Sequence, residues 1–204
     1  ETYRKQASGR GRFAEIEIIV SPSPIDQKGL QFINSTKASV LSKEFVVAVE
    51  KGIKAAMGTG VMAGYPVYCA KVELVDAVMN SESDALAFEI CGTIAFKEAT
   101  RKIKCNLLEP IMKLEVDTPE EYVGDVTGDV NRRRGEITGI EAQVYSTAVK
   151  AIIPLGETFG YITSLRSLTS GRANMSMEFS HYSITPNELA QEIIFKMKGI
   201  RVTL

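Results

Sequence analysis

The order of periodic segments between residues 107 and 185 constrains the fold of this 204-residue chain more than any other feature. Apolar and charged residues alternate over 112–117, which is typical of a half-buried strand, and further strands are expected over 136–142, 143–154 and 174–183. Apolar residues recur at helical spacing over 118–135 and 158–168. The resulting order, β-α-β-β-α-β, predicts a split-βαβ, ferredoxin-like module.

Two similar tetrapeptides predict helix starts in this half of the chain. In Thr118-Pro119-Glu120-Glu121 we expect Thr118 to cap a helix and Glu121 to return to the cap amide, with Gly135 as the left-handed residue at the far end. Thr185-Pro186-Asn187-Glu188 repeats the same chemistry and predicts a C-terminal helix.

Residues 1–106 form a second set of periodic segments. Period-2 patterns predict strands over 13–20 and 67–75, and helical spacing predicts one helix from a Ser42 cap to a stop at Gly58 and another ending near Lys104. We therefore expect an α+β chain of two modules with a boundary near Asn106, followed by a C-terminal helix.

Charge excludes a general polyanion-binding coat, because 24 Lys and Arg balance 25 Asp and Glu. Residues 1–106 hold 14 basic and 12 acidic side chains, and residues 107–204 hold 10 and 13. Basic residues do cluster locally, and the clusters are Arg10 with Arg12, Arg132 to Arg134, and Arg166 with Arg172. Each cluster fits either a phosphate contact or an ordinary structural role at a terminus or helix end.

Most enzyme classes lack the residues that they need. There is no GxxxxGK[ST] phosphate loop, and a single histidine, His181, excludes an HExxH zinc site. Cys69, Cys91 and Cys105 have no metal-type spacing and are expected to be reduced core residues. We expect no catalytic residue, metal or cofactor in this chain. No apolar run is long enough for a signal peptide or membrane span, so we expect a soluble, cytoplasmic protein.

Several longer strings carry a family resemblance. They are Ala48-Val49-Glu50-Lys51-Gly52-Ile53, Ala63-Gly64-Tyr65-Pro66-Val67, Leu107-Leu108-Glu109-Pro110-Ile111-Met112, Gly124-Asp125-Val126, Arg133-Arg134-Gly135, Phe159-Gly160-Tyr161, Leu165-Arg166-Ser167, and Met177-Glu178-Phe179 with His181-Tyr182. Together they resemble the C-terminal part of the elongation factor G family.

The resemblance implies a domain for each module. Residues 1–106 are similar to domain IV, a ribosomal-protein-S5-domain-2-like module, and helix 186–204 would pack back on it. Residues 107–185 are similar to the ferredoxin-like domain V. The chain would then be part of a longer GTPase, with GTP and magnesium bound in an N-terminal domain that precedes this region.

The resemblance also implies a function, which is promotion of tRNA-mRNA translocation by insertion of domain IV into the small-subunit decoding site. The implied partners are both ribosomal subunits, tRNA-mRNA and rRNA, with the protein a monomer and no membrane contact. The residues implied at the domain IV tip are Gln6, Ala7, Ser8, Gly9 and Arg10 in one loop, and Val78, Met79, Asn80, Ser81 and Glu82 in the other. The rRNA-contact candidates in domain V are Arg132, Arg133, Arg166 and Arg172.

Both tip loops depart from the family: Ala7-Ser8 stand where Ser-Gly is usual, and Val78 and Asn80 stand where tyrosine and aspartate usually flank a histidine. Met79 stands where the family usually has a histidine, and a methionine cannot donate a hydrogen bond to RNA. A divergent copy of the factor is therefore expected. Alternatives within the GTPase superfamily are a ribosomal protection factor for tetracycline resistance and a recycling factor. An alternative of another class is a freestanding ferredoxin-like binding module.

Overall fold

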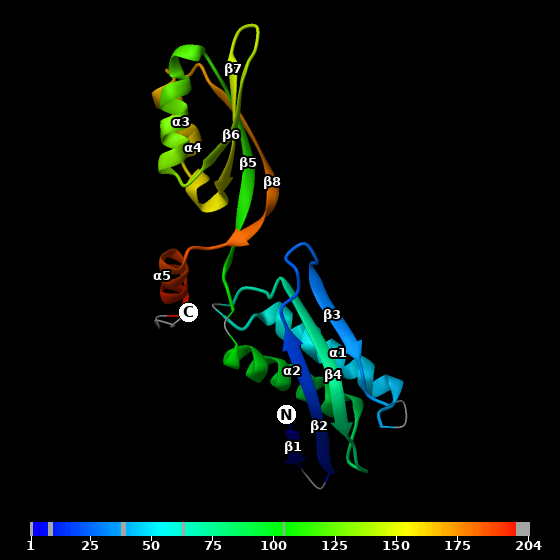
Figure 1. Ribbon diagram of the computed structural model, residues 1–204. Helices are drawn as coiled ribbons and strands as arrows, with labels where there is room; N and C mark the ends of the chain where they lie inside the picture. The colour runs from blue at the N-terminus through cyan, green and yellow to red at the C-terminus, as the bar shows by residue number, and fades with distance from the viewer. Residues whose placement is uncertain (1, 8–9, 38–39, 63, 104, 199–204) are drawn as a thin grey trace. The chain divides into compact units, whose positions relative to one another are not determined.

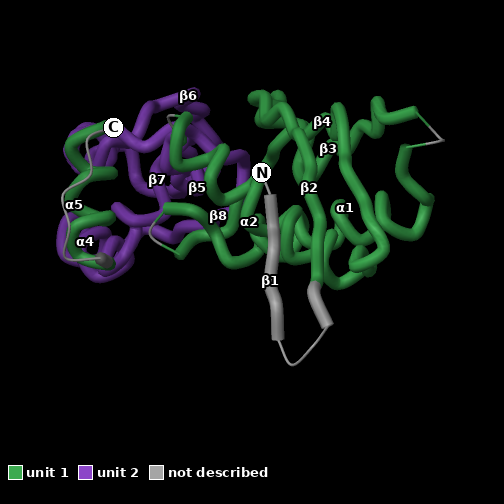
Figure 2. The backbone as a smooth tube through the Cα atoms, turned by 90° about the horizontal axis from the view of Figure 1, so that it is seen from below, with its two compact units in different colours: residues 1–105, 187–204 green, residues 106–186 purple. Residues whose placement is uncertain are grey.

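The chain forms two compact units, Glu1–Cys105 with Asn187–Leu204, and Asn106–Pro186 (Figure 2). The computed structural model describes residues 2–7, 10–37, 40–62, 64–103 and 105–198, with only the backbone of 2–7, 10–11 and 198. We call them unit 1 and unit 2 and describe each by itself.

Unit 1 is a four-stranded sheet with two helices against one face (Figure 1). The strand order is β1 (Thr2–Ala7), β2 (Arg10–Ser21), β4 (Cys69–Val78) and β3 (Gly29–Asn34). β2 is antiparallel to β1 and β4, while β3 and β4 are parallel and are joined through helix α1 (Lys43–Thr59). Helix α2 (Ala85–Lys102) follows β4.

The core of unit 1 lies between this sheet and the two helices. Ile16 of β2 and Val72 and Leu74 of β4 are at most 1% exposed, and they pack with Ile53 of α1 and Phe88 of α2. Val72 and Leu74 are two apart in sequence, as are Ile16 and the equally buried Ala14, so one face of each strand is buried, as the period-2 pattern predicts.

Two glycines allow α1 and α2 to approach closely. A Cβ on Gly52 would lie 1.9 Å from the carbonyl oxygen of Glu89, and a Cβ on Gly92 would lie 2.7 Å from that of Val49. The Thr93 hydroxyl donates to the Gly52 carbonyl at 2.9 Å, so the crossing also contains a direct hydrogen bond.

The ends of α1 partly match the sequence prediction. Ser42 is the N-cap, and its hydroxyl accepts from the Phe45 amide at 3.4 Å. The predicted stop at Gly58 is wrong: the helix continues to Thr59, and Gly60 takes the left-handed φ of 71°.

Unit 2 has the predicted β-α-β-β-α-β order. Its elements are β5 (Leu108–Thr118), α3 (Val123–Arg132), β6 (Glu136–Ala142), β7 (Thr147–Pro154), α4 (Tyr161–Leu168) and β8 (Asn174–Ile184). The sheet order is β6-β7-β5-β8 with every pair antiparallel, and α3 and α4 cover one face (Figure 1). The ferredoxin-like prediction is confirmed. Leu114, Val116, Val149, Val126 and Leu165 are among the buried residues of its core.

The predicted capping box at Thr118 is wrong. Thr118 is the last residue of β5, paired with Thr147, and its buried hydroxyl has no hydrogen-bond partner among the described residues. Pro119 is extended, and a 3-10 turn, η1 (Glu120–Tyr122), precedes α3. Sheet pairing therefore determines the conformation of Thr118, and the Glu121 carboxylate lies 2.6 Å from Arg172 instead of the cap amide.

The end of α3 also differs from the prediction. Arg134, not Gly135, takes the left-handed conformation, with φ 60°. Gly135 is required for another reason, because a Cβ there would lie 2.5 Å from Cγ1 of Val130.

Helix α5 (Asn187–Lys198) begins where the second tetrapeptide predicts a helix, and it belongs to unit 1. The buried Thr185 hydroxyl finds no hydrogen-bond partner in the part of the chain that the structure describes, so the predicted capping role of Thr185 is wrong. The described helices include none long and apolar enough to cross a membrane.

Two strands of unit 1 lie outside the segments that the sequence patterns predict. β1 falls in the glycine-bearing start of the chain, and β3 contains only one period-2 pair, Leu30 and Phe32. Both of these side chains in β3 are partly buried against the core of unit 1.

Candidate nucleic-acid interface

The two segments expected at the domain IV tip lie at the same end of the unit 1 sheet. β4 ends at Val78, which pairs with Glu15, and β2 extends beyond this pair toward Arg10, opposite Ala7. Ser8 and Gly9 fall outside the described residues, and the side chains of Gln6, Ala7 and Arg10 are not described.

Hydrogen bonds join the loop of residues 78–82 to β2. The Phe13 amide donates to the Glu82 carbonyl at 3.3 Å, and the Ser83 hydroxyl donates to the Phe13 carbonyl at 2.8 Å. Arg10 is three residues beyond Phe13, so the β1-β2 hairpin reaches about 10 Å past this junction. The hairpin and the loop therefore form a two-part end, which we call the unit 1 tip.

Asn80 organises the loop internally. Its backbone N–H donates to the Ser83 hydroxyl at 2.9 Å, and its side-chain oxygen accepts from the backbone N–H of Glu82 at 2.8 Å. The Ser83 amide donates to the Asn80 carbonyl at 3.1 Å. The turn at Ser81 is thus held before any partner arrives, which lowers the entropy cost of binding.

An ion pair that sequence reasoning missed braces the base of the tip. Arg12 Nε lies 3.0 Å from Asp84 Oδ2, and both side chains are 45% exposed. Asp84 Oδ1 accepts from the Ala87 amide at 2.6 Å as the N-cap of α2. Asp84 stands at the end of a polar turn, directly before a helical repeat, and this position could have identified it as a cap. No pattern in the sequence pointed to its distant partner, Arg12.

Two apolar side chains are exposed on the loop. Val78 and Met79 are each 47% exposed, while Asn80, Ser81 and Glu82 beside them are exposed and polar. The loop can therefore offer van der Waals contact and backbone or Asn80 hydrogen bonds, but Met79 supplies no side-chain donor.

Arg133 in unit 2 is engaged within the protein. Its guanidinium lies 2.9 Å from Asp129, donates to the Glu157 carbonyl at 3.0 Å and to the Ser164 hydroxyl at 2.9 Å, and lies 5.1 Å from the centre of the Tyr161 ring. Only 21% of the side chain is exposed. These contacts connect the end of α3 to α4 and leave few donors for a phosphate.

The neighbours of Arg133 differ in availability. Arg132 is 75% exposed and lies 3.9 Å from Asp129, so its guanidinium can reach a ligand. Arg134 donates to both carboxylate oxygens of Glu109, at 3.1 and 2.5 Å. The hydrogen bond to Glu109 raises the pKa of Arg134 and keeps this side chain charged and paired.

Arg172 lies at the opposite end of the sheet from Arg132. It precedes β8, whose first residue, Asn174, pairs with Asp117 near the end of β5. Its guanidinium stacks 4.7 Å from the centre of the Tyr122 ring, and the Tyr122 hydroxyl and Glu121 carboxylate bind it. The hydrogen bond to Tyr122 raises the pKa of Arg172, and half of the side chain remains exposed.

Arg166 lies in the last turn of α4 and is exposed. Within the part of the chain that the structure describes, no ion pair or side-chain hydrogen bond reaches it. The four candidate arginines of unit 2 are therefore not one patch: Arg132 and Arg133 adjoin at the end of α3, and Arg172 is near the start of that helix.

The open face of the unit 2 sheet has the wrong chemistry for stacking RNA bases. It carries Lys113 paired with Glu178 at 3.2 Å and Lys150 paired with Glu141 at 2.7 Å, with Glu115 in addition. Sheet-face RNA recognition uses aromatic side chains on such a face. Contacts of unit 2 with RNA would therefore come from its helix ends and loops.

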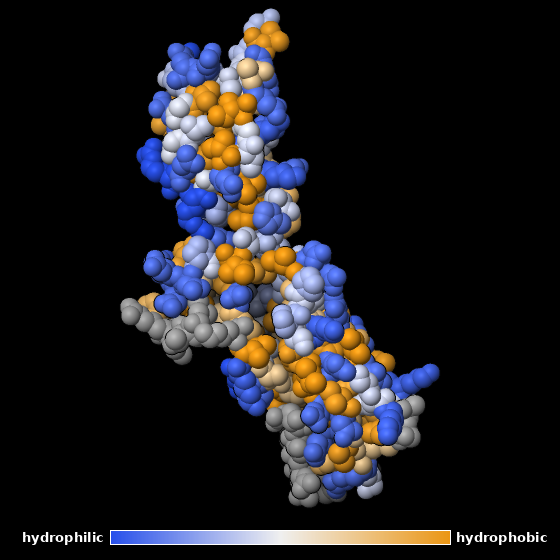
Figure 3. Space-filling view, viewed as in Figure 1, coloured by the Kyte–Doolittle hydropathy of each residue, from blue (hydrophilic) through white to orange (hydrophobic). Residues whose placement is uncertain are grey.

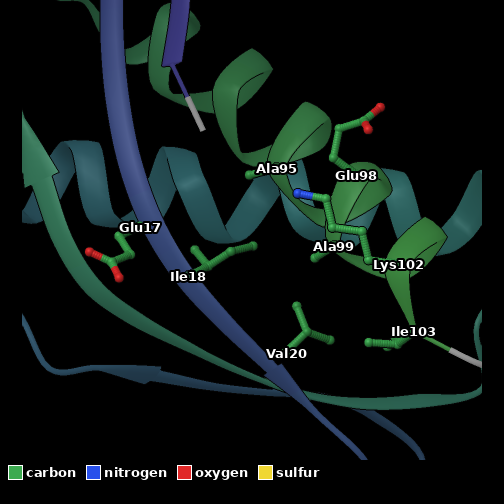
Figure 4. Close-up of a pocket in the computed structure, with 8 residues that line it drawn as sticks. All are labelled: Glu17, Ile18, Val20, Ala95, Glu98, Ala99, Lys102 and Ile103. Carbon is green, nitrogen blue, oxygen red and sulfur yellow. The ribbon is translucent and has the colours of Figure 1, made fainter.

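Unit 1 has a shallow cavity whose lining contains no histidine, cysteine or serine among the described residues. It measures about 340 Å³ and lies between β2 and α2, with Ile18, Val20, Ala95, Ala99 and Ile103 as apolar lining (Figure 4). Glu17, Glu98 and Lys102 complete the lining. The described residues contain no cluster of three histidine, cysteine or acidic groups that could hold a metal ion.

The single histidine is also not in a catalytic arrangement. His181 Nδ1 lies 2.9 Å from the hydroxyl of its neighbour Ser180 on β8. No carboxylate of the described residues pairs with it, which a serine hydrolase would need to orient the ring.

Comparison with known protein families gives two matches that together span most of the chain. A family model described as "Elongation factor G, domain IV" matches residues 1–104, and one described as "Elongation factor G C-terminus" matches residues 106–193. The chain belongs to the elongation factor G family.

Individual relatives agree with this assignment. Elongation factor G of Cytophaga hutchinsonii is 46% identical over 204 residues, which is 100% of this chain and 29% of that protein. Elongation factor G of Amoebophilus asiaticus is 46% identical over 200 residues, or 98% of this chain and 28% of that protein. This chain thus spans less than a third of the length of these elongation factor G relatives.

A solved structure supports the fold. A crystal structure of a protein from Thermus thermophilus matches with a TM-score of 0.88 and 34% identity, covering 98% of this chain and 30% of that chain. The α+β fold predicted from the family resemblance is therefore confirmed.

Proposed function

We propose that this chain is the ribosome-binding C-terminal region of a translational GTPase that promotes tRNA-mRNA translocation. The observation that carries the proposal is the family match over residues 1–104 and 106–193. GTP and magnesium would bind in a part of the protein that this chain does not span, since its sequence has no phosphate loop.

The unit 1 tip is the part proposed to enter the small-subunit decoding site. Support comes from its hairpin, which reaches about 10 Å beyond Phe13, and from the loop that hydrogen bonds hold beside it. A braced, narrow end can act by occupying space behind a moving tRNA, without bond chemistry. The Asn80-centred hydrogen bonds would keep Val78 and Met79 presented to the codon-anticodon helix.

In unit 2, Arg132 and Arg166 are the proposed rRNA contacts. Both are exposed, and their bonding within the protein is weak or absent in the described residues. Arg172 is the weaker candidate: half of its side chain is exposed, but Tyr122 and Glu121 already bind its guanidinium. Arg133 is proposed to act by positioning Arg132 and α4, because its own donors are used internally.

The proposal places the protein in the cytoplasm, on the ribosome. It is tested with the full-length protein and purified ribosomes in a reconstituted translation reaction. It predicts co-sedimentation with ribosomes, ribosome-stimulated GTP hydrolysis and movement of mRNA by three nucleotides in a toeprint assay. A protein that neither co-sediments with ribosomes nor hydrolyses GTP on them would exclude the proposal and favour the alternative of a freestanding ferredoxin-like binding module.

Met79 favours a second candidate function, ribosomal protection or recycling. The loop position is 47% exposed and has no side-chain donor, so contact with the codon-anticodon helix would be weaker than with histidine. Growth of cells expressing the parent gene under tetracycline separates the two: protection against the drug, without toeprint movement, would favour this second candidate.

A further inference from the structure

The free end of the β6-β7 hairpin in unit 2 carries two adjacent, highly exposed apolar side chains. Val144 is 85% exposed and Tyr145 is 96% exposed. Figure 1 shows the hairpin projecting beyond α3, and Figure 3 shows hydrophobic atoms at its free end. None of the residues proposed above to contact RNA lies in this turn.

The turn is held in place although its two central side chains are free. The backbone N–H of Gln143 donates to the Ser146 carbonyl at 2.8 Å, and the Ser146 hydroxyl donates to the side-chain oxygen of Gln143 at 3.2 Å. The side-chain nitrogen of Gln143 also donates to the Asp117 carboxylate at 3.5 Å. A preformed turn loses little conformational entropy when it docks.

The surroundings of the turn are acidic. Strand pairing places Asp117 and Glu141 opposite Ala148, close to the turn, and Glu120, Glu121 and Asp125 follow the end of β5. The nearby cations are already paired, since Lys150 binds Glu141 and Arg172 binds Glu121. Unit 2 as a whole has 7 Lys and Arg against 11 Asp and Glu, a net charge of -4.

We infer that Val144 and Tyr145 dock into an apolar pocket on a basic protein surface of the ribosome. The acidic surroundings oppose approach to RNA phosphates and favour a positively charged protein partner. Aromatic side chains at the centre of an interface often supply much of its binding energy. This inference rests on the proposed ribosome-binding function.

A photo-crosslinking experiment distinguishes a protein partner from RNA. A benzophenone amino acid replaces Tyr145 in the full-length protein, which is bound to purified ribosomes and irradiated. The inference predicts an adduct that resists ribonuclease and is lost on digestion with protease. An adduct that ribonuclease removes would overturn it, because position 145 would then face RNA.

Substitutions test the energetic role of the ring. Tyr145→Ala is expected to weaken ribosome affinity about tenfold or more, and Tyr145→Phe to stay within about twofold of the unmodified protein. Thr138→Ala, at an exposed position of the same strand β6, is the matched control and is expected to bind like the unmodified protein. Equal affinity of the Tyr145→Ala variant would overturn the inference.

Failure of the inference and failure of the proposed function are distinguishable. If the unmodified protein does not co-sediment with ribosomes, the proposed function fails and the inference falls with it. If the protein co-sediments but position 145 gives no adduct, only the inference is overturned.

Discussion

Arg133 is a partly buried arginine whose guanidinium contacts three polar groups and the Tyr161 ring. Arg133→Ala would remove these contacts and leave the Asp129 side chain, which is 11% exposed, with a weak partner at 3.9 Å. We expect the free energy of unfolding of unit 2 to fall by about 2 to 4 kcal/mol. Urea denaturation of the 204-residue chain measures the change.

Arg132 provides the control for this prediction. It belongs to the same arginine run but is 75% exposed, so Arg132→Ala should change stability by less than about 0.5 kcal/mol. For ribosome affinity we expect the opposite order: Arg132→Ala should weaken binding more than its small effect on stability explains, and Arg133→Ala should not. Equal destabilisation by the two variants would contradict a structural role for Arg133.

Tyr161 should make unit 2 sensitive to alkaline pH. Burial raises its pKa to about 12, and none of the described residues forms a hydrogen bond with its hydroxyl. Because the folded-state pKa lies above the ordinary value of about 10, the unfolded state ionises first. The contribution of neutral Tyr161 to the free energy of unfolding is therefore fully present below pH 10. Between pH 10 and about 12 this contribution is lost, and the free energy of unfolding falls by about 2 to 3 kcal/mol.

Tyr161→Phe isolates this effect. The variant keeps the buried ring, removes the unpaired hydroxyl, and is expected to be as stable as the unmodified chain or more stable at pH 7. The difference between the two urea midpoints should grow above pH 10. A difference that stays constant from pH 7 to 11 would show that Tyr161 ionises as readily folded as unfolded.

Met79→His tests the chemistry of the unit 1 tip. An imidazole can donate a hydrogen bond and stack on RNA, whereas the thioether cannot. The variant of the full-length protein should give faster mRNA movement in a toeprint assay. Unchanged movement would count against a role for this exposed position in translocation.

At the residue scale, sequence prediction failed where tertiary contacts competed with local signals. Thr118 has the right neighbours for a cap, yet pairing with Thr147 keeps it in the strand. Arg12 and Asp84 are 72 positions apart, so no local pattern could indicate their ion pair. Arg133 looks like an ordinary helix-end cation, and only its contacts with Glu157 and Ser164 reveal its internal role.

At the element scale, the crossing of α1 and α2 depends on Gly52. Gly52→Ala would bring a Cβ within 1.9 Å of the Glu89 carbonyl oxygen, so the helices must separate. We expect unit 1 to lose about 3 kcal/mol or more of stability, through overpacking against backbone. Thermal unfolding followed by circular dichroism measures the loss.

Gly58→Ala is the matched control in the same helix. Apart from the adjoining backbone of the helix itself, no described atom lies within 4 Å of a Cβ at this position, so alanine should be tolerated and can stabilise the helix by up to about 1 kcal/mol. If both glycine variants unfolded at the same temperature, a close crossing at Gly52 would be excluded.

Long periodic elements were predictable, while short ones were not. In unit 2 the periodic patterns were clear enough to predict the order of strands and helices along the chain, and the structure has the same order. β3 has only six residues, and it obtains its stability from parallel pairing with β4, 40 residues further along the chain at Gly29 and Cys69. Such non-local pairing has no signature within a short window.

At the scale of the whole chain, a formal charge of -1 conceals two different units. Unit 1 carries 17 Lys and Arg against 14 Asp and Glu, and unit 2 carries 7 against 11. The unit with the proposed decoding-site tip is therefore net positive, which suits an RNA environment. The proposed contact of unit 2 with rRNA would have to be local, at Arg132 and Arg166, because the net charge of this unit opposes binding to RNA.

The central claim is that the unit 1 tip enters the decoding site, and directed hydroxyl-radical cleavage tests it most directly. Iron chelate is attached to Met79→Cys in the full-length protein after Cys69 and Cys105 are changed to serine, while buried Cys91 is retained. The same protein with Met79 intact is the control. We predict cleavage of small-subunit rRNA around the decoding site. Ribosome-bound protein that cleaves rRNA only elsewhere, or no more than the control, would contradict the claim.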